Sequence, residues 1–393
     1  MRWWGSKAAR EPARPVLGRA HGLPITAAAG RDALSVDGAP RSYEARVREA
    51  YRSNPVAQRA VRLVAEGAGG APLKPGAIAN LVNAPSAGQD LLETAATHLL
   101  LHGNAFVQIV EGMDGRPVEL FALRPERVAT ETDARGWPAA FHYRAGEHRT
   151  RVAADRVVAL RLPDPLDDHA GLGCLAAAAA AVTLHNQATR WNLGLLANAA
   201  RPSGALVHEA EGNMPLTAEQ VRRLREELDI MFAGGNNAGR PMLLDGGLRW
   251  QSLSFSPADM DFEALKAAAA RDIALAFGVP PMLLGLPGDS THANYREANR
   301  ALWRLTLLPL LGKMLGGLGH ALGRWFPGER LEVDLDRVPA LAEDRERLWR
   351  QVGGADFLST EEKRALVGVV ASAPEGGRAH PLPPPARAGG GEA

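Results

Sequence analysis

A break between two helical patterns near residue 280 constrains the fold more than any other feature of this chain. Residues 273–299 read IALAFGVPPMLLGLPGDSTHANYREAN, so a helical pattern ends at Gly278 and the prolines of residues 279–281 stop it from continuing. A Gly/Pro/Asp/Ser loop follows, and a second helical pattern then covers residues 293–325. Pro309 lies in the middle of that pattern, and we expect a kink there because proline removes one backbone hydrogen bond.

Two further helical patterns, residues 175–198 and 257–277, enclose a small module. Six consecutive alanines in the first pattern favour helix and let neighbouring helices approach closely. Ser256 is the expected cap of the second. The module, residues 202–255, is predicted to hold a strand, a helix capped by Thr217 with Gln220, and a hairpin. Its predicted strands are residues 204–209, 241–244 and 248–255. The arrangement indicates two long helices that carry a small α/β module.

Residues 42–160 mix helix and strand patterns and predict an α+β domain. Ser86 and Gln89 are spaced as a capping box before a helix that Gly103 ends. Alternating and β-branched segments follow, with Asp-Gly and Arg-Gly turns between them. The predicted strands are residues 105–110, 118–122, 128–131, 139–143 and 157–160, and a further strand is expected at 331–335.

Composition excludes several classes of protein. The 393 residues include 45 basic and 44 acidic side chains, a net charge of +1, whereas a protein that grips DNA tightly is usually basic. The length predicts two or three folding units. Cys174 is the single cysteine, which rules out an internal disulfide framework and a four-cysteine metal site. Residues 1–40 and 373–393 lack periodicity and predict a flexible arm and a disordered tail.

Motifs for catalysis are weak. No P-loop is present, so the chain is not a P-loop ATPase. Residues 171–176 match a dinucleotide-binding pattern, but a loop and not a strand precedes them. His98 and His102 are interpreted as helix-surface histidines. The enzymatic alternative is a metal-dependent nuclease that would use the residues of one acidic loop, Asp164, Asp167, Asp168 and His169.

A membrane association is the third possibility. Residues 301–323 are apolar enough to be compared with a membrane span, which needs about 20 mostly apolar residues. This segment contains Arg304, Lys313 and Pro309 and is interrupted by glycines, so we interpret it as a helix buried in protein. No membrane partner is expected.

The order of these elements, with several short motifs, resembles the portal (connector) proteins of tailed phages. The resemblance covers roughly residues 42–370 and is nearest to the long-tailed-phage branch and the compact portals of prophages and gene transfer agents. The motifs that carry it are Asn54-Pro55-Val56, Gly103-Asn104-Ala105-Phe106-Val107, Leu123-Arg124-Pro125, Gly171-Leu172-Gly173, Arg201-Pro202-Ser203-Gly204, Phe277-Gly278-Val279-Pro280-Pro281 and Asn294-Tyr295-Arg296-Glu297-Ala298.

The resemblance implies a portal architecture with the parts that such proteins share. Residues 1–40 would be an arm, residues 41–173 an α+β wing, residues 174–200 a first stem helix and residues 201–256 the clip. Residues 257–278 would be a second stem helix and residues 279–292 the tunnel loop. Residues 293–338 would form a long kinked helix that returns to the wing, residues 339–372 a short helical crown and residues 373–393 a tail.

The resemblance also implies a role without an enzyme activity, cofactor or metal. The chain would form a dodecameric ring at one capsid vertex, through which double-stranded DNA enters and leaves without sequence specificity. Its partners would be the terminase large subunit, a head–tail adaptor and the major capsid protein. The channel residues would be Leu286, Pro287, Gly288, Asp289, Ser290, Thr291 and His292. The docking surface on the clip would be Arg222, Arg223, Arg225, Glu226 and Asp229.

Overall fold

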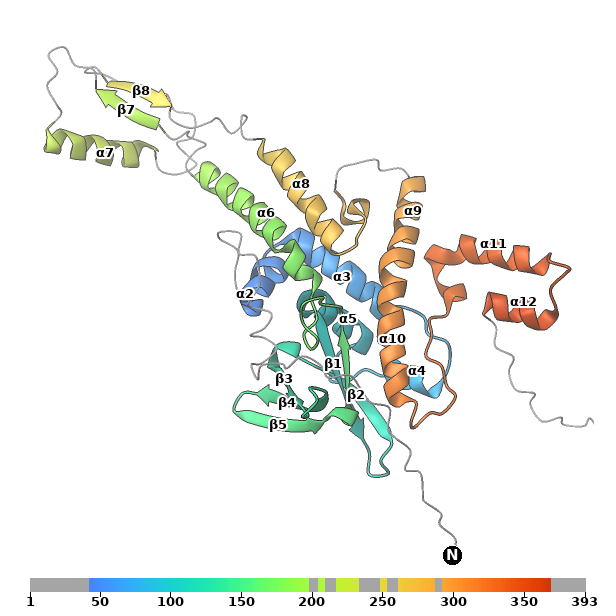
Figure 1. The fold of residues 1–393 in the computed structure, drawn as a ribbon. Helices are drawn as coiled ribbons and strands as arrows, with labels where there is room; N and C mark the ends of the chain where they lie inside the picture. Colours follow the sequence, from blue (N-terminus) through green and yellow to red (C-terminus); the bar gives the residue numbers. More distant parts are fainter. Residues whose placement is uncertain are drawn as a thin grey trace, which may run out of the picture. The chain divides into compact units, whose positions relative to one another are not determined.

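The computed structural model of this chain combines helices with antiparallel sheets (Figure 1), so the predicted α+β class is confirmed. It describes residues 42–197, 204–208, 217–232, 248–252, 261–286 and 292–368. The chain divides into two compact units, Met1–Asp334 and Leu335–Ala393, which are described separately below.

Two three-stranded antiparallel sheets lie in the region that the resemblance assigns to the wing. Their strand orders are β2-β1-β6 and β3-β4-β5. The strands are β1 (Asn104–Glu111), β2 (Pro117–Leu123), β3 (Val128–Thr132), β4 (Pro138–Ala145), β5 (His148–Ala153) and β6 (Val157–Arg161), with short 3-10 helices at Pro125–Arg127 and Ala154–Arg156. Strand β5 was not predicted because five of its six residues are exposed, which leaves no apolar alternation to detect.

Five helical segments precede and cover the sheets. They are α2 (Tyr43–Val47), the π-helical η1 (Arg48–Arg52), α3 (Pro55–Gly69), α4 (Ala77–Asn83) and α5 (Leu91–His102). The predicted capping box is wrong. Asp90 caps α5 by accepting a hydrogen bond from the backbone N–H of Glu93 at 2.8 Å, whereas Ser86 and Gln89 pair with each other in a turn. The aspartate is the better placed acceptor because it directly precedes the helix.

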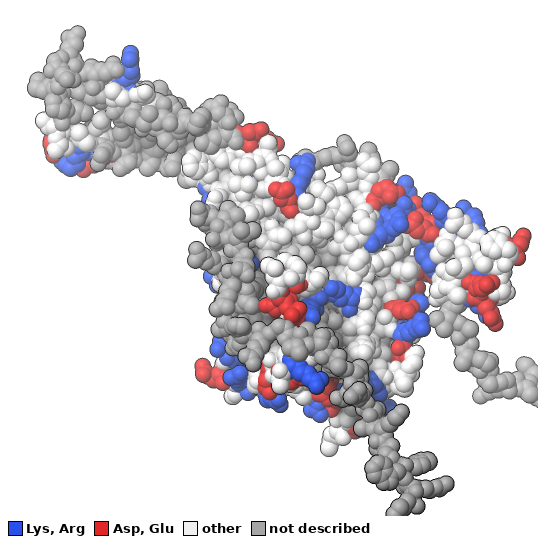
Figure 2. Space-filling view, viewed as in Figure 1, with Lys and Arg blue, Asp and Glu red and all other residues white. Residues whose placement is uncertain are grey.

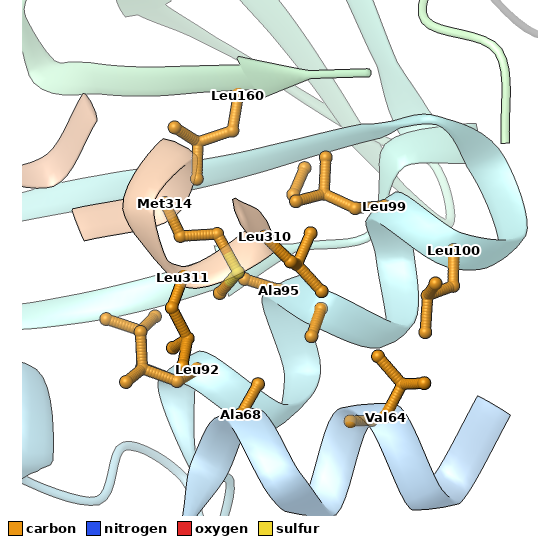
Figure 3. Close-up of a cluster of buried hydrophobic side chains, with 14 of the residues drawn as sticks. Val64, Ala68, Leu92, Ala95, Leu99, Leu100, Leu160, Leu310, Leu311 and Met314 are labelled. Atoms are coloured by element: carbon orange, nitrogen blue, oxygen red, sulfur yellow. The ribbon is translucent and has the colours of Figure 1, made fainter. Parts of the chain in front are cut away.

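The main core lies where α3, α5 and the first sheet meet α10 (Leu308–Leu322). Figure 3 shows leucine, valine and methionine side chains from these four elements converging. Leu311, Met314 and Leu318 of α10 are fully buried, and each contributes about 1.5–3 kcal/mol relative to exposure. Gly317 lets α10 lie against Leu160 of β6, because a Cβ at this position would overlap the leucine side chain.

A smaller apolar cluster joins the two sheets. Phe106 of β1 packs on Phe141 of β4 with ring centroids 5.4 Å apart. Val128, Val152 and Val157 complete the cluster. This contact fixes the second sheet to the first, so the wing is built around two neighbouring apolar centres.

The two helices that the resemblance assigns to the stem, α6 (Cys174–Ala197) and α8 (Phe262–Ala276), pack along each other (Figure 1). Trp191 and Phe262 stack between them with ring centroids 6.2 Å apart. The predicted start of the second helix at Pro257 is wrong. The helix begins at Phe262, because Asp261 caps it by accepting a hydrogen bond from the backbone N–H of Ala264. Residues 253–260 lie outside the described part of the chain.

Asn54 ties helix α3 to stem helix α6. Its Oδ1 caps α3 by accepting a hydrogen bond from the backbone N–H of Ala57, while its Nδ2 donates to Oδ1 of Asn186 at 2.9 Å. The same Nδ2 lies 3.2 Å from Nδ1 of His185. Buried polar groups need such partners, so the Asn54-Pro55-Val56 motif is a helix cap that also positions the stem.

The small module between the stem helices contains β7 (Gly204–His208), α7 (Ala218–Phe232) and β8 (Leu248–Ser252). Strands β7 and β8 pair antiparallel. Thr217 and Gln220 form the predicted cap of α7 through reciprocal side-chain and backbone hydrogen bonds. The predicted strand at residues 241–244 lies outside the described residues.

The second unit is helical. Two 3-10 turns, Leu335–Arg337 and Pro339–Leu341, precede α11 (Ala342–Gly353) and α12 (Thr360–Val367). The capping box of Ser359 and Glu362 is confirmed at the start of α12. The strand expected at residues 331–335 is wrong, because the end of the first unit forms an isolated bridge between Val333 and Leu73 there and no strand.

Candidate functional site

The loop predicted at residues 279–292 starts from a tightly capped helix end. Gly278, at φ +65°, follows the end of α8. The backbone N–H of Val279 donates to the carbonyl of Ala274 at 2.9 Å, and that of Gly278 donates to Leu275 at 3.0 Å. This pair of bonds is a Schellman motif, in which glycine takes the left-handed position without Cβ strain. The helix therefore ends at a defined residue.

A hydrogen bond joins the two sides of this loop. The hydroxyl of Thr306 donates to the carbonyl of Gly278 at 2.6 Å. Phe277 and Val279, on either side of Gly278, are buried in the main core. The base of the loop is therefore held both by packing and by a bond between segments that are distant in sequence. Sequence reasoning missed Thr306, and the only signal was its position just before Pro309.

Pro309 explains the backbone around Thr306. The long helix consists of α9 (His292–Leu302), the π-helical η6 (Trp303–Leu307) and α10, so it ends at Leu322 and not at residue 325. The backbone N–H of Leu308 donates to the carbonyl of Trp303 across the wider π turn. Because proline has no N–H to donate, the hydrogen-bond register changes just before it. The structure thus shows a π-helical turn just before Pro309, and the kink expected at this position stays a prediction.

The described part of the loop is a short 3-10 turn, η5 (Pro281–Leu284). Gly285 ends the turn at φ +72°. Leu283 and Leu284 pack partly against the main core. Of the predicted channel residues, Leu286 follows this turn and His292 begins α9, whereas residues 287–291 lie outside the described part of the chain. Their place at a constriction therefore remains a prediction.

Two leucines beside the loop base are largely exposed to solvent. Leu275 in the last turn of α8 is 79 % exposed, and Leu305 immediately before Thr306 is 77 % exposed. Figure 2 shows a broad area with few charged side chains over α8 and the α9–α10 helix on the visible face. Further exposed apolar residues on α6, α8 and α9 are Leu184, Trp191, Leu193, Leu265 and Tyr295. Such exposure is typical of a surface that another protein covers.

The predicted docking residues on α7 form a network of paired charges. Arg222 binds Glu219 at 2.6 Å and Glu226 at 2.7 Å, and Arg223 binds Glu219 at 3.1 Å. Hydrogen bonds from Arg222 and, to a smaller extent, from Arg223 lower the pKa of Glu219. Arg222, Arg223 and Glu226 are exposed. The side chains of Arg225 and Asp229 lie outside the described part of the structure.

The acidic loop proposed for a nuclease is used for local backbone contacts. Asp164 accepts a hydrogen bond from the backbone N–H of Leu166, and Asp167 accepts from those of His169 and Ala170. Among the described residues, no cluster of three or more His, Cys, Asp or Glu side chains could hold a metal ion. The structure therefore gives no support to the nuclease alternative.

Three glycines bring the end of α5 against the start of α6. Gly103 has φ +89°, and a Cβ there would overlap the backbone of Gly171 and Gly173. The backbone N–H of Leu162 donates to the carbonyl of Gly103 at 2.8 Å. Residues 171–173 are thus a loop that leads into a helix, as the sequence indicated, and the glycines serve close backbone packing.

The prediction that His98 and His102 lie on the helix surface is wrong for His102, whereas His98 is half-buried. His102 is 4 % exposed, and its ring meets the ring of Tyr43 edge-on at 4.8 Å. The pKa of both histidines is lowered to about 4, mainly by burial. The charge of Arg124 lowers the pKa of His98 further, and the charges of His98 and Arg46 do the same for His102. The prediction failed at His102 because most residues of α5, including those of its last turn, are buried.

One helical run, Asn294–Leu322, is long and apolar enough to be compared with a membrane span. In its apolar window 39 % of residues are buried inside the structure. Leucines of α10 in this run form the main core. The apolar character of this segment is thus explained in part by packing within the protein.

Comparison with known proteins agrees with this architecture. The sequence model of the phage portal protein family matches residues 55–368. A chain from the virion of a native gene transfer agent particle is 45 % identical, with a TM-score of 0.64, and the match covers 84 % of this chain and 94 % of that one.

A chain from the neck of a native gene transfer agent particle, determined with C12 symmetry, is 43 % identical with a TM-score of 0.64; 89 % of this chain and 99 % of that one are covered. An uncharacterised protein of Rickettsia bellii is 40 % identical over 342 residues, covering 82 % of this chain and 88 % of the relative. The resemblance inferred from the motifs is therefore confirmed: this chain belongs to the phage portal protein family.

Proposed function

We propose that this protein forms a ring, twelvefold in symmetry, at one vertex of a phage-like capsid and provides the channel through which DNA enters and leaves. The observation that carries this proposal is the match to nearly the whole of a chain from a particle neck determined with C12 symmetry. A closed ring requires heterologous contacts between neighbouring subunits, so one surface of each subunit must meet a different surface of its neighbour.

The exposed apolar side chains beside the loop base supply one of those surfaces. Leu275 and Leu305 lie on segments that the Thr306–Gly278 hydrogen bond joins, and both are about three-quarters exposed in the single subunit. Burial in a neighbour would remove this apolar area from water, which contributes roughly 25 cal/mol per Å². The ring therefore accounts for apolar residues that the isolated subunit leaves in solvent.

Replacing both leucines with glutamate should abolish the ring. In Leu275→Glu/Leu305→Glu protein, each closed interface would contain unpaired carboxylates, whereas the core residues are untouched. We expect wild-type protein to give rings with a central hole in electron micrographs and the double variant to give single subunits with an unchanged circular dichroism spectrum. Met113→Glu is the matched control, because Met113 is fully exposed on the β1–β2 turn, and should still form rings. Rings from the double variant would place the interface elsewhere.

Residues 286–292 are proposed to line the narrowest part of the channel. Phosphate contacts dominate affinity for DNA, so a channel that lets DNA slide must avoid cations at its constriction. Gly288, Asp289, Ser290 and Thr291 are small or polar, and Asp289 would repel phosphate. The capped base at Gly278, with its bond to Thr306, would hold both sides of the loop in place.

Asp289→Arg should slow or stall packaging, because a ring of arginines would bind the phosphates that pass. We expect at least a tenfold drop in the DNA content of particles, measured after nuclease treatment of the outside. Asp114→Arg makes the same charge change on the β1–β2 turn and should leave the DNA content near the wild-type value. Equal DNA content in the two variants would contradict the placement of residues 286–292.

The face of α7 is proposed to dock the terminase during packaging and a head–tail adaptor afterwards. Arg222 and Arg223 are exposed, yet their guanidinium groups are neutralised by Glu219 and Glu226 of the same helix. A partner would therefore recognise a surface of alternating charges and not a net positive patch. No catalytic role is proposed for this chain.

A further inference from the structure

The wing contains a groove that the proposed channel does not use. It has a volume of about 1180 Å³ and lies between the first helical turns, helix α5 and the β3-β4-β5 sheet. Figure 1 places α2 and this sheet on neighbouring parts of the first unit. Tyr43, Val47 and Tyr51 line one wall, and Thr94, Thr97 and His98 of α5 contribute another.

Strand β3 borders the groove with its free edge. Four consecutive residues, Val128 to Glu131, line the groove, although successive side chains in a strand point to opposite faces. They can share one groove only if it runs along the backbone edge of the strand. The neighbouring strand β4 contributes only alternate residues, His142 and Arg144, which lie on one face.

Within the described part of the structure no second strand pairs with that edge, although the backbone N–H of Val128, at the start of β3, donates to the carbonyl of Pro125. In the order β3-β4-β5, strand β3 pairs with β4 on one side and with no other described strand. An open strand edge is a template for an additional extended segment, whose main chain supplies hydrogen bonds. The groove is thus shaped for a peptide in extended conformation.

The groove also has an excess of cations. Its six arginines are Arg48, Arg52, Arg124, Arg127, Arg144 and Arg149, against three carboxylates at Glu44, Glu126 and Glu131. Glu131 is already bound by Arg151 and His142, both at distances below 3.0 Å. Arg144 and Arg149 stand directly opposite each other across β4 and β5, a pairing that destabilises a sheet unless an anion lies nearby. An acidic occupant would relieve this repulsion.

One stretch of this chain is acidic, as the groove requires, and is close enough in sequence to reach it. Residues 32–37 read DALSVD, with two carboxylates and no cation, and are flanked by Arg31 and Gly38. In extended conformation Leu34 and Val36 would share one face and Asp37 would lie on the other. The sheet has matching faces, with Phe141 in an apolar cluster on one side and Arg144 on the other. Five residues lie between Asp37 and Tyr43 at the groove wall, and the six steps from one to the other span up to about 20 Å.

We propose that residues 32–37 of the chain bind in this groove as an added strand along β3, with Asp37 among the groove arginines. The tether gives the segment an effective concentration in the millimolar range, so a modest affinity suffices. The short strand would then join the chain before α2 to the wing. An acidic segment of a neighbouring subunit or of another protein is the competing occupant, and the experiment below separates these cases.

Hydrogen–deuterium exchange on the purified full-length protein tests this proposal. We expect the amides of residues 32–37 to exchange at least tenfold more slowly than those of residues 20–28, which share the same stretch but lack carboxylates. Protection should be unchanged on dilution, because the segment and the groove belong to one chain. Unprotected amides at residues 32–37, or protection that falls with dilution, would overturn the proposal.

A charge-reversal pair gives the matched control. Arg144→Glu/Arg149→Glu should raise the exchange of residues 32–37 to the level of residues 20–28, and Asp37→Arg in that background should restore part of the protection. Arg135→Glu, at the opposite β3–β4 turn outside the groove, should leave protection unchanged. Protection that survives the double reversal would contradict recognition by the groove arginines.

Discussion

Gly103→Ala is expected to prevent stable folding, with a loss above about 4 kcal/mol in the free energy of unfolding. The left-handed conformation at φ +89° costs roughly 1–2 kcal/mol for a residue with a Cβ. The larger part arises because the added methyl would overlap the backbone of Gly171 and Gly173, and backbone cannot rotate away as a side chain can. The measurement is soluble yield followed by chemical denaturation of whatever protein folds.

Gly146→Ala separates the two causes. Gly146 in the β4–β5 turn also has positive φ, +61°, but an added Cβ there meets no atom within 4 Å. We expect this control to lose only about 1–2 kcal/mol, the conformational cost alone. If both variants lost the same small amount, the close approach of α5 and the loop before α6 would not limit the fold.

Acidification from pH 6.5 to pH 4 is expected to remove several kcal/mol of stability before most carboxylates titrate. His98 and His102 have an ordinary pKa of 6.5 and a folded-state pKa of about 4, because burial disfavours their charged forms. The unfolded chain therefore takes up protons first as the pH falls. The contribution of these two histidines to the free energy of unfolding is fully present above pH 6.5. It is lost progressively as the pH falls to 4, by roughly 3 kcal/mol for each histidine.

The hydrogen bonding of His102 explains why protonation is unfavourable there. Oδ1 of Asn104 accepts a hydrogen bond from the backbone N–H of Gly171 at 3.0 Å, so its Nδ2 must face Nδ1 of His102, 3.2 Å away. Nδ1 therefore acts as the acceptor in the neutral ring. A proton on Nδ1 would place two donors against each other in a buried site, where an unmade hydrogen bond is costly.

Asn104→Asp provides the test. The aspartate keeps an acceptor for Gly171 and places a carboxylate oxygen against Nδ1 of His102, which favours the protonated ring. Urea denaturation at a series of pH values should show a free energy of unfolding that changes less between pH 6.5 and 4 in this variant than in the wild type. An equal slope in the two proteins would mean that His102 does not carry the acid sensitivity.

Local sequence determined most of the elements and the family. The strands β1, β2, β3, β4 and β6, the helix α6 that follows Gly173, and the cap at Thr217 all follow from periodicity and capping chemistry, which act over a few residues. The break at Gly278 was equally visible, because a Schellman end and two prolines are local features. The motifs between these elements sufficed to identify the portal resemblance.

Only the tertiary structure decided which of the local signals prevailed and which distant residues meet. Whether a histidine on α5 faces water depends on what covers the helix at that position, and the last turn of α5, with His102, is buried. The Thr306–Gly278 bond, the approach of Gly103 to Gly171 and the open edge of β3 beside six arginines join segments far apart in sequence. Periodicity reports the environment along one element, whereas these contacts depend on how separate elements pack, so no pattern within a single segment could encode them.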